Sequence, residues 1–178
     1  MKAHLFYRRE LGATLIEVLI VVSIVSILLN LALFELKPFL AKNRLDNQVQ
    51  LIKRAVAISR LNAQANNAYV TFCALHNNQC NYQFWHKELT VFVDNGEIGV
   101  FDNNDTKIVQ FEAINKLDML TYNKRNALTF LPNGRPMGLN NGTFIYCPEY
   151  KEASLSGLAI SVNIVGRVKV IDTDKCQQ

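Results

Sequence analysis

Hydrophobic residues form one continuous block near the start of the chain. Leu11 to Phe34, with the sequence LGATLIEVLIVVSIVSILLNLALF, holds no charged residue other than Glu17. A helix rising about 1.5 Å per residue would extend roughly 36 Å over this stretch, and the hydrocarbon core of a bilayer is about 30 Å thick. The block therefore predicts a membrane-spanning helix.

Helical spacing of apolar residues continues beyond the block, over residues 35–66. Charged residues fall between the apolar ones, which indicates a helix with one face in a core. Pro38 predicts a kink about where this helix leaves the bilayer, and the polar amides at 62–67 predict its end. The apolar stripe consists of Leu45, Val49, Ile52, Val56 and Ala63, and the charged residues on other faces are Lys42, Asp46, Lys53, Arg54 and Arg60.

From Tyr69 the pattern changes to short strands separated by turn residues. Asn-Gly pairs supply positive φ at low cost, so Asp94-Asn95-Gly96 predicts a tight turn, and Pro132-Asn133-Gly134 predicts another. Residues 76–81 and 102–105 predict polar loops, the second lacking the residue order of a calcium loop. The predicted fold class is α+β, a long helix packed against an antiparallel sheet. The expected strands are 69–73, 82–85, 89–93, 108–111, 118–122, 128–131, 143–147, 158–164 and 167–171.

Length and charge change this picture little. Of 178 residues, about 130 remain once the first twelve and the thirty or so of the predicted anchor are set aside, enough for one domain. The formal net charge is +4, of which +2 lies in the first twelve residues, with Lys2, Arg8 and Arg9 against Glu10. The rest of the chain is thus only weakly basic, which hints at an anionic partner and no more.

The four cysteines, Cys73, Cys80, Cys147 and Cys176, allow three pairings. An even count in an exported domain indicates disulfides. We favour Cys73 with Cys80 and Cys147 with Cys176, the second of which would pin the C-terminal tail to the sheet. Buried free thiols are one alternative. A metal site of Cys73, His76, Cys80 and His86 is another, although its spacing lacks the usual C-x₂-C pattern, and no metal is expected.

Glu17 is the residue of the apolar block that needs an explanation. A carboxylate inside hydrocarbon costs at least a few kcal/mol and persists there mainly when it has a partner or a task. The glutamate follows Gly12-Ala13-Thr14-Leu15-Ile16, and a short basic leader precedes these residues. The arrangement resembles the class III signal of type IV pilins and pseudopilins. The alternative is an ordinary single-span anchor, or an uncleaved signal peptide, with a chance glutamate.

The resemblance implies a defined processing and assembly. In that family a prepilin peptidase cuts after the glycine and the new terminal amine is N-methylated, which here implies cleavage between Gly12 and Ala13 and methylation of Ala13. It also implies that Glu17 pairs with the terminal ammonium of a neighbouring subunit, since opposite charges in a low dielectric attract strongly. The expected organisation is a leader at 1–12, a transmembrane and assembly helix at 13–36, and a periplasmic head at 37–178 that includes the amphipathic second half of the helix.

Landmarks farther along the chain sharpen the resemblance. Individually they are weak, but their order is similar to that in the minor pseudopilin family, which contains the type II secretion pseudopilin H and the type IV pilus protein FimT. The landmarks are KNRL at 42–45, Trp85 before VFVDNG at 91–96, FLPNG at 130–134, Cys147, and GRVK at 166–169.

FimT-type proteins bind DNA for natural transformation, or competence, through a G-R-x-R motif. The matching positions here are Gly166 to Lys169, with a lysine in place of the second arginine. Alternate residues of a strand share a face, so Arg167 and Lys169 could contact successive phosphates without sequence preference and with strong salt dependence. Lys151 and Lys175 would add charge. The alternative is an edge strand whose charges only discourage strand pairing.

Two other functional classes are possible. One is a structural minor pseudopilin of the type II secretion system that binds no DNA. The other is an enzyme, which is not expected, because the histidines are scattered and neither G-x-S-x-G nor H-E-x-x-H occurs. No cofactor is expected. The implied partners are DNA, other major and minor pilins, the prepilin peptidase and the bacterial inner membrane, which the chain would cross once with its head in the periplasm or on a pilus.

Overall fold

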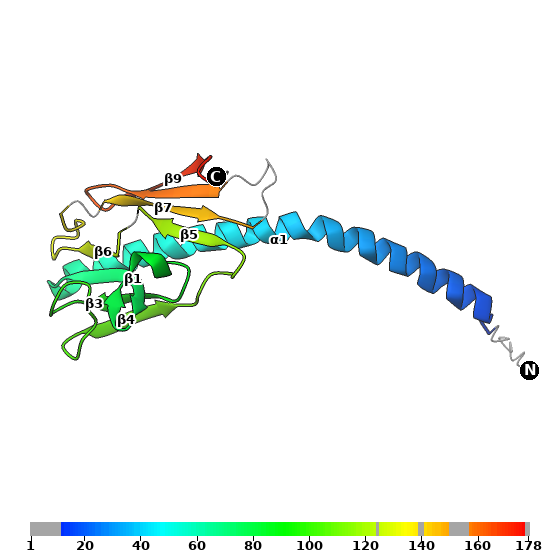
Figure 1. Cartoon of the computed structure of the whole chain (residues 1–178), viewed down its shortest axis with the longest axis horizontal. Helices are drawn as coiled ribbons and strands as arrows, with labels where there is room; N and C mark the ends of the chain where they lie inside the picture. Colours follow the sequence, from blue (N-terminus) through cyan, green and yellow to red (C-terminus); the bar gives the residue numbers. More distant parts are fainter. Residues whose placement is uncertain (1–11, 124, 139–140, 150–156, 177–178) are drawn as a thin grey trace, which may run out of the picture. The chain divides into compact units, whose positions relative to one another are not determined.

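A single long helix leads into a β-rich head (Figure 1). The computed structural model describes residues 12–123, 125–138, 141–149 and 157–176. Helix α1 (Leu15–Asn66) runs through both compact units of the chain, residues 1–37 and 38–178, and Pro38 lies inside it. The predicted leader at 1–12 falls almost entirely outside the described residues.

The end of α1 is where the sequence predicted it. Asn67 has a positive φ of 49°, and the N–H of Ala68 donates to the carbonyl of Ala63 at 3.2 Å. This is the hydrogen bond of a Schellman motif, in which a left-handed residue, usually glycine and sometimes asparagine, terminates the helix.

The described part of the head contains two antiparallel sheets. In the first, β1 pairs with β3 on one side and with β6 on the other, while β2 and β4 extend it. The second has the order β5-β7-β8-β9, so that β5 and β9 are its edges. The strands are β1 (Val70–His76), β2 (Gln79–Cys80), β3 (Leu89–Val93), β4 (Thr106–Phe111), β5 (Met119–Tyr122), β6 (Ala127–Phe130), β7 (Gly142–Cys147), β8 (Gly157–Val162) and β9 (Val168–Thr173).

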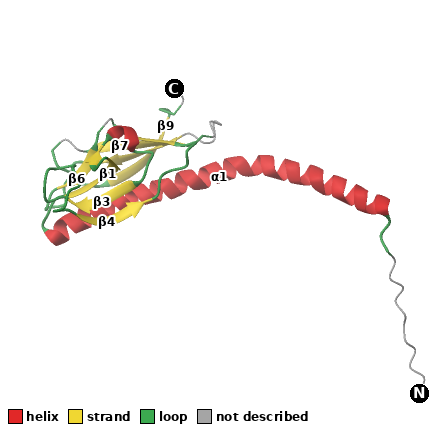
Figure 2. Cartoon of the chain, turned by 60° about the horizontal axis from the view of Figure 1, so that its bottom comes forward, coloured by secondary structure: helices red, strands yellow, loops and turns green. Residues whose placement is uncertain are grey.

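Both sheets cover the part of α1 that belongs to the head (Figure 2). The predicted apolar stripe of α1 is confirmed, since each of its residues is at most 5% exposed. Aromatic side chains join the two sheets across the core: the ring of Phe72 on β1 lies 5.9 Å from that of Phe144 on β7, and Trp85 packs edge-on against Tyr122 of β5. The α+β fold class is therefore confirmed.

The prediction of a strand at Tyr82–Trp85 is wrong. Tyr82–Phe84 forms a short 3₁₀ helix, η1, because the Asn81 side chain accepts a hydrogen bond from the N–H of Gln83 and caps it. Trp85 is fully buried, and its Nε1 donates to the carbonyl of Arg125 at 2.9 Å. The predicted loop at 76–81 is also partly wrong, since it includes β2, which pairs back onto the end of β1.

The prediction of a tight turn at Asn95-Gly96 is wrong as well. β3 and β4 are joined by residues 94–105, and the positive φ in this connection belongs to Gly99 rather than to Gly96. Side chains distant in sequence hold the loop: the amide of Asn95 donates to the carbonyl of Asn104, and Asp105 accepts from the N–H of Asn95. Residues 102–105 form a turn, as predicted.

Two disulfides fasten the head, and they are the pairs that we favoured from the sequence. Cys73 is bonded to Cys80 and Cys147 to Cys176, so the chain has no free cysteine. The first lies at the β1–β2 hairpin, and the second ties the segment after β9 to the end of β7. The interpretation as free thiols and the interpretation as a metal site are therefore wrong, because disulfide sulfurs are not thiolate ligands.

Candidate functional site

The first turn of α1 contains the glutamate that the sequence singled out. Thr14 caps the helix, with its Oγ1 accepting a hydrogen bond from the N–H of Glu17 at 3.3 Å. Thr14-Leu15-Ile16-Glu17 has the spacing of a capping box, in which a glutamate at this position favours the helix start. Gly12, Ala13 and Glu17 are exposed, and none of them belongs to the core of the described residues.

The apolar side chains of this part of α1 are exposed. The helix includes a stretch that is long and apolar enough to cross a membrane, by length and composition. Its mean hydropathy is 2.6, and none of it is buried within the protein. Leu15 is 82% exposed, and Ile27 and Leu31 are each more than 60% exposed. An exposed apolar surface of this size indicates contact with lipid or with another protein.

A second candidate site is the turn between β8 and β9 together with the start of β9, residues 163–169, which we call the basic hairpin. Its turn is closed by the side chain of Asn163, whose Oδ1 accepts hydrogen bonds from the N–H groups of Val165 and Arg167 at 3.0 and 2.9 Å. Gly166 has a φ of 76°, and a methyl group on it would lie 3.2 Å from the carbonyl oxygen of Gly134. The hairpin therefore needs glycine at this position.

Arg167 and Lys169 are both exposed, the first directly before β9 and the second within it. Lys169 pairs with Ser161 of β8, while Val168 and Val170, which alternate with the two cations, pack against the core. Arg167 and Lys169 thus lie on the outer side of the sheet, as the sequence predicted from strand alternation. Arg167 itself precedes the strand rather than belonging to it, a small correction to the predicted boundaries.

The remaining predicted cations lie elsewhere. Lys175 follows β9, at the end of the strand opposite to Arg167, and a six-residue strand is about 20 Å long. Asp172 and Asp174 stand close to Lys175 in sequence. Lys151 lies outside the described residues. The structure therefore brings Arg167 and Lys169 together but does not bring Lys175 to them.

The structure places further cations near the hairpin, which the sequence did not link to it. The groove between α1 and the hairpin has a volume of about 320 Å³ and is lined by Lys53, Arg60, Gly166 and Val168 among others. Arg135, in the loop after β6, donates from Nε to the carbonyl of Ile164 at 3.5 Å. The one signal available in the sequence was the seven-residue spacing of Lys53 and Arg60, which places them on one face of a helix.

Asp118 is a buried carboxylate with a structural role. Its oxygens accept hydrogen bonds from Arg44 of α1, from the hydroxyl of Tyr146 on β7 and from the N–H of Glu149. Burial alone would raise the pKa of Asp118, but these donors outweigh it and hold the pKa below its usual value. Burial raises the pKa of Tyr146, and the hydrogen bond that Tyr146 donates to Asp118 raises it further. The group fastens α1 to the second sheet.

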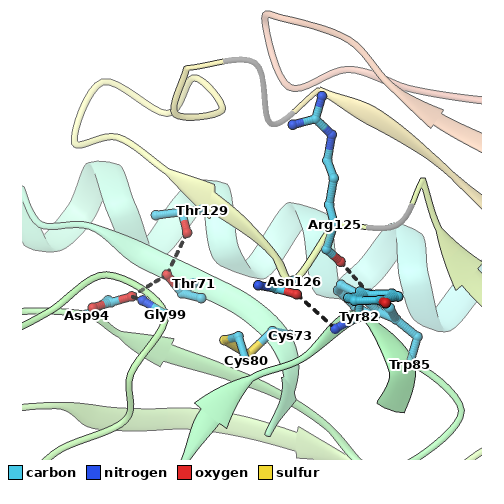
Figure 3. The surroundings of a disulfide bond; sticks show 10 residues. All are labelled: Thr71, Cys73, Cys80, Tyr82, Trp85, Asp94, Gly99, Arg125, Asn126 and Thr129. Carbon is cyan, nitrogen blue, oxygen red and sulfur yellow. Dashed lines mark hydrogen bonds between the residues drawn. A yellow bond between two sulfur atoms is a disulfide. The ribbon is translucent and has the colours of Figure 1, made fainter.

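Asp94 is a second buried carboxylate, close to the Cys73–Cys80 disulfide (Figure 3). Its Oδ2 accepts from the hydroxyl of Thr71 and from the N–H of Gly99, while its Oδ1 is buried without a hydrogen-bond partner in the structure. Here burial outweighs the hydrogen bonds, and the pKa of Asp94 is raised. These contacts fix the β3–β4 loop against β1.

The described parts of the chain show no cluster of metal ligands. They contain no group of three or more histidine, cysteine, aspartate or glutamate side chains that could hold a metal ion. His76, one of the metal ligands considered from the sequence, stacks on Phe84 with ring centroids 4.1 Å apart.

Comparisons with known proteins agree with this architecture. The model of the prokaryotic N-terminal methylation motif matches residues 7–29, and the model of the type II transport protein GspH matches residues 48–166, more than half of the chain. A search of curated proteins found no match.

Solved structures show the same fold. A crystal structure of the type IV minor pilin FimU of Pseudomonas aeruginosa has a TM-score of 0.61 and 18% identity, covering 78% of this chain and 99% of that one. The minor pseudopilin EpsH of the Vibrio cholerae type 2 secretion system has a TM-score of 0.50 and 12% identity, covering 72% and 97%. The methylation motif and the apolar helix fit an anchor in the inner membrane with a periplasmic head. The chain belongs to the family of the type II transport protein GspH, and it is a type IV minor pilin or pseudopilin.

Proposed function

We propose that this minor pilin assembles into or primes a type IV pilus and binds DNA without sequence preference, for uptake during natural transformation. Its role is one of binding and assembly rather than catalysis. Arg167 and Lys169 would contact phosphates, and Gly166 would hold the hairpin that presents them. Lys175 and Lys151 would add to the attraction from other positions.

The observation that carries this proposal is uncompensated positive charge on the hairpin. Arg167 and Lys169 are exposed, residues 157–171 contain no carboxylate, and neither cation forms an ion pair within the described residues. Cations in such a setting attract phosphates, and the counterions released from DNA favour binding without recognition of bases. Lys169 would act as a point charge, because it lacks the planar fork with which arginine binds phosphate.

For the N-terminal unit we propose the processing of a type IV pilin. Prepilin peptidase would cut between Gly12 and Ala13, Ala13 would be N-methylated, and Glu17 would pair with the terminal ammonium of an adjacent pilin. The exposed apolar side chains of α1 support this proposal, because they suit both a bilayer and the packing of helices within a filament. The head would then lie in the periplasm or, after assembly, on the pilus at the cell surface.

A structural pseudopilin of a type II secretion system is the second candidate function. The match to the GspH model over residues 48–166 favours it. In that case the cations of β9 would serve only to protect an edge strand of the second sheet from pairing with other chains.

DNA binding by the full-length protein in a non-ionic detergent tests the proposal. We expect fluorescence anisotropy to show similar affinity for duplexes of unrelated sequence, and binding that weakens steeply as salt rises from about 50 to about 200 mM. Arg167→Gln with Lys169→Gln should weaken binding about tenfold or more and lower the slope of log affinity against log salt by about 2.

Lys87→Gln with Lys116→Gln is the matched control. These two exposed lysines lie near η1 and β5, away from the hairpin. This control should leave affinity within about twofold. Absence of DNA binding, or equal affinity of the hairpin variant and the control, would favour the secretion pseudopilin. Self-association of the hairpin variant without a change in DNA binding would identify the cations as edge protection.

A further inference from the structure

We propose that the DNA backbone crosses the groove between α1 and the basic hairpin, where Lys53 and Arg60 of α1 and Arg135 of the loop after β6 bind its phosphates. The inference rests on the proposed function. It extends the contact surface from one hairpin to three segments that are distant in sequence.

The helix and the hairpin lie close together at this groove. A methyl group built on Gly166 would lie 3.4 Å from Cδ of Arg60, so the stem of that arginine passes against the turn that carries Arg167. Lys53 lies two helical turns before Arg60 on the same face and lines the same groove. A chain of phosphates that follows the groove and passes over the β9 edge of the sheet would therefore meet the cations of the helix and then Arg167 on the outer side.

The loop after β6 completes the cluster. Gln64 near the end of α1 donates to the carbonyl of Asn133 at 3.4 Å, and Arg135 donates to the carbonyl of Ile164 in the hairpin. The loop is therefore held against both other segments. Only Nε of Arg135 makes a side-chain hydrogen bond within the described residues, which leaves its two terminal nitrogens for a ligand.

Charge at the groove is of one sign. Residues 47–68, 127–138 and 157–171 contain no aspartate or glutamate, although they supply the whole of the helix, loop and hairpin around the groove. None of Lys53, Arg60 and Arg135 forms an ion pair in the part of the chain that the structure describes. A polyanion is the ligand that such a lining attracts, and the exposed hairpin cations lie across the β9 edge of the sheet from it.

Arg54 supplies a matched control on the same helix. It is exposed, next in sequence to Lys53, and lines a different groove on the side of β4, with Leu51 and Phe111. Arg54→Gln removes the same charge as Arg60→Gln from the other side of α1. A diffuse attraction of DNA to the whole head would respond to both variants, whereas a site in the proposed groove responds to one.

The test measures anisotropy of labelled duplex DNA with the full-length protein in a non-ionic detergent, over a range of salt. Arg60→Gln, Lys53→Gln and Arg135→Gln should each weaken binding about three- to tenfold and lower the salt slope by about 1, equally for unrelated sequences. Arg54→Gln should change affinity by less than about twofold, and Arg60→Lys should recover most of the loss. Lys53→Gln guards against a folding defect of the Arg60 variant, because Lys53 is exposed.

The outcomes separate this inference from the function on which it rests. If the three variants behave like Arg54→Gln while Arg167→Gln with Lys169→Gln weakens binding, DNA contacts the hairpin alone and the inference is wrong. If all arginine and lysine variants, Arg54→Gln included, weaken binding equally, attraction is diffuse and the inference is again wrong. If the unmodified protein binds no DNA, the proposed function fails first.

Discussion

Asp118 and Asp94 are buried carboxyl groups whose pKa values move in opposite directions. Arg44, Tyr146 and the N–H of Glu149 hold the pKa of Asp118 below 3.8, so the ionised group contributes stability above about pH 4 that is lost as pH falls through its folded pKa. Burial raises the pKa of Asp94 above 3.8, so the contribution of its protonated form is present at low pH and is lost as pH rises through the folded pKa.

Asparagine substitutions should reveal this difference. Asp118→Asn leaves Arg44 without its partner and should cost about 2 kcal/mol of unfolding free energy at pH 7, with the loss shrinking toward pH 3. The loss for Asp94→Asn should instead grow on acidification, because the unmodified protein then gains the stability of its protonated carboxyl. Thermal unfolding of the full-length protein from pH 3 to pH 7 measures both. Losses that change with pH in the same direction would contradict this account.

At the level of elements, the sequence predicted what neighbouring residues determine. The short, mainly apolar run at Leu89–Val93 predicted the correct strand, and the stripe on α1 predicted the correct buried face. Asn95-Gly96 failed because Asn104 and Asp105, nine or more residues away, hold the loop in another shape. The same holds for the candidate site. Sequence spacing was enough to place Arg167 and Lys169 on one side of the sheet, but only the packing of α1 near the hairpin brings Arg60 close to Gly166.

The Cys147–Cys176 disulfide acts at the scale of elements, because it fastens the segment after β9 to the end of β7. Gly157 is required beneath it, since a methyl group there would collide with Sγ of Cys176 and lie 2.6 Å from the carbonyl oxygen of Tyr146. Replacing both cysteines by alanine should cost about 2–4 kcal/mol, the value for a loop of this length. Denaturant unfolding measures the loss. Relative to the unmodified protein, hydrogen exchange in the variant should be accelerated more in β9 than in β1. Uniform acceleration of both strands would contradict a local role.

The whole molecule divides its apolar residues between two environments. In the described residues of 38–178 they form a core in which helix and sheets bury one another. In the described residues of the first unit, the apolar side chains of α1 find no partner within the chain. The same hydrophobic effect that folds the head therefore directs the first half of α1 toward lipid or other subunits.

A substitution of Glu17 can test, in the intact cell, whether the first half of α1 packs against other subunits. A carboxylate among apolar side chains is costly unless a cation meets it, and the ammonium of a processed pilin is the cation that the proposed assembly supplies. Glu17→Gln should therefore leave cleavage before Ala13 intact but lower the amount of protein in sheared filaments about tenfold or more, with the remainder in the inner membrane. N-terminal sequencing and immunoblots of the two fractions measure this. Glu17→Asp is the matched control, because it keeps the charge. Equal filament amounts for Glu17→Gln and the unmodified protein would mean that the glutamate serves only the capping box with Thr14, and that apolar packing alone holds the subunit.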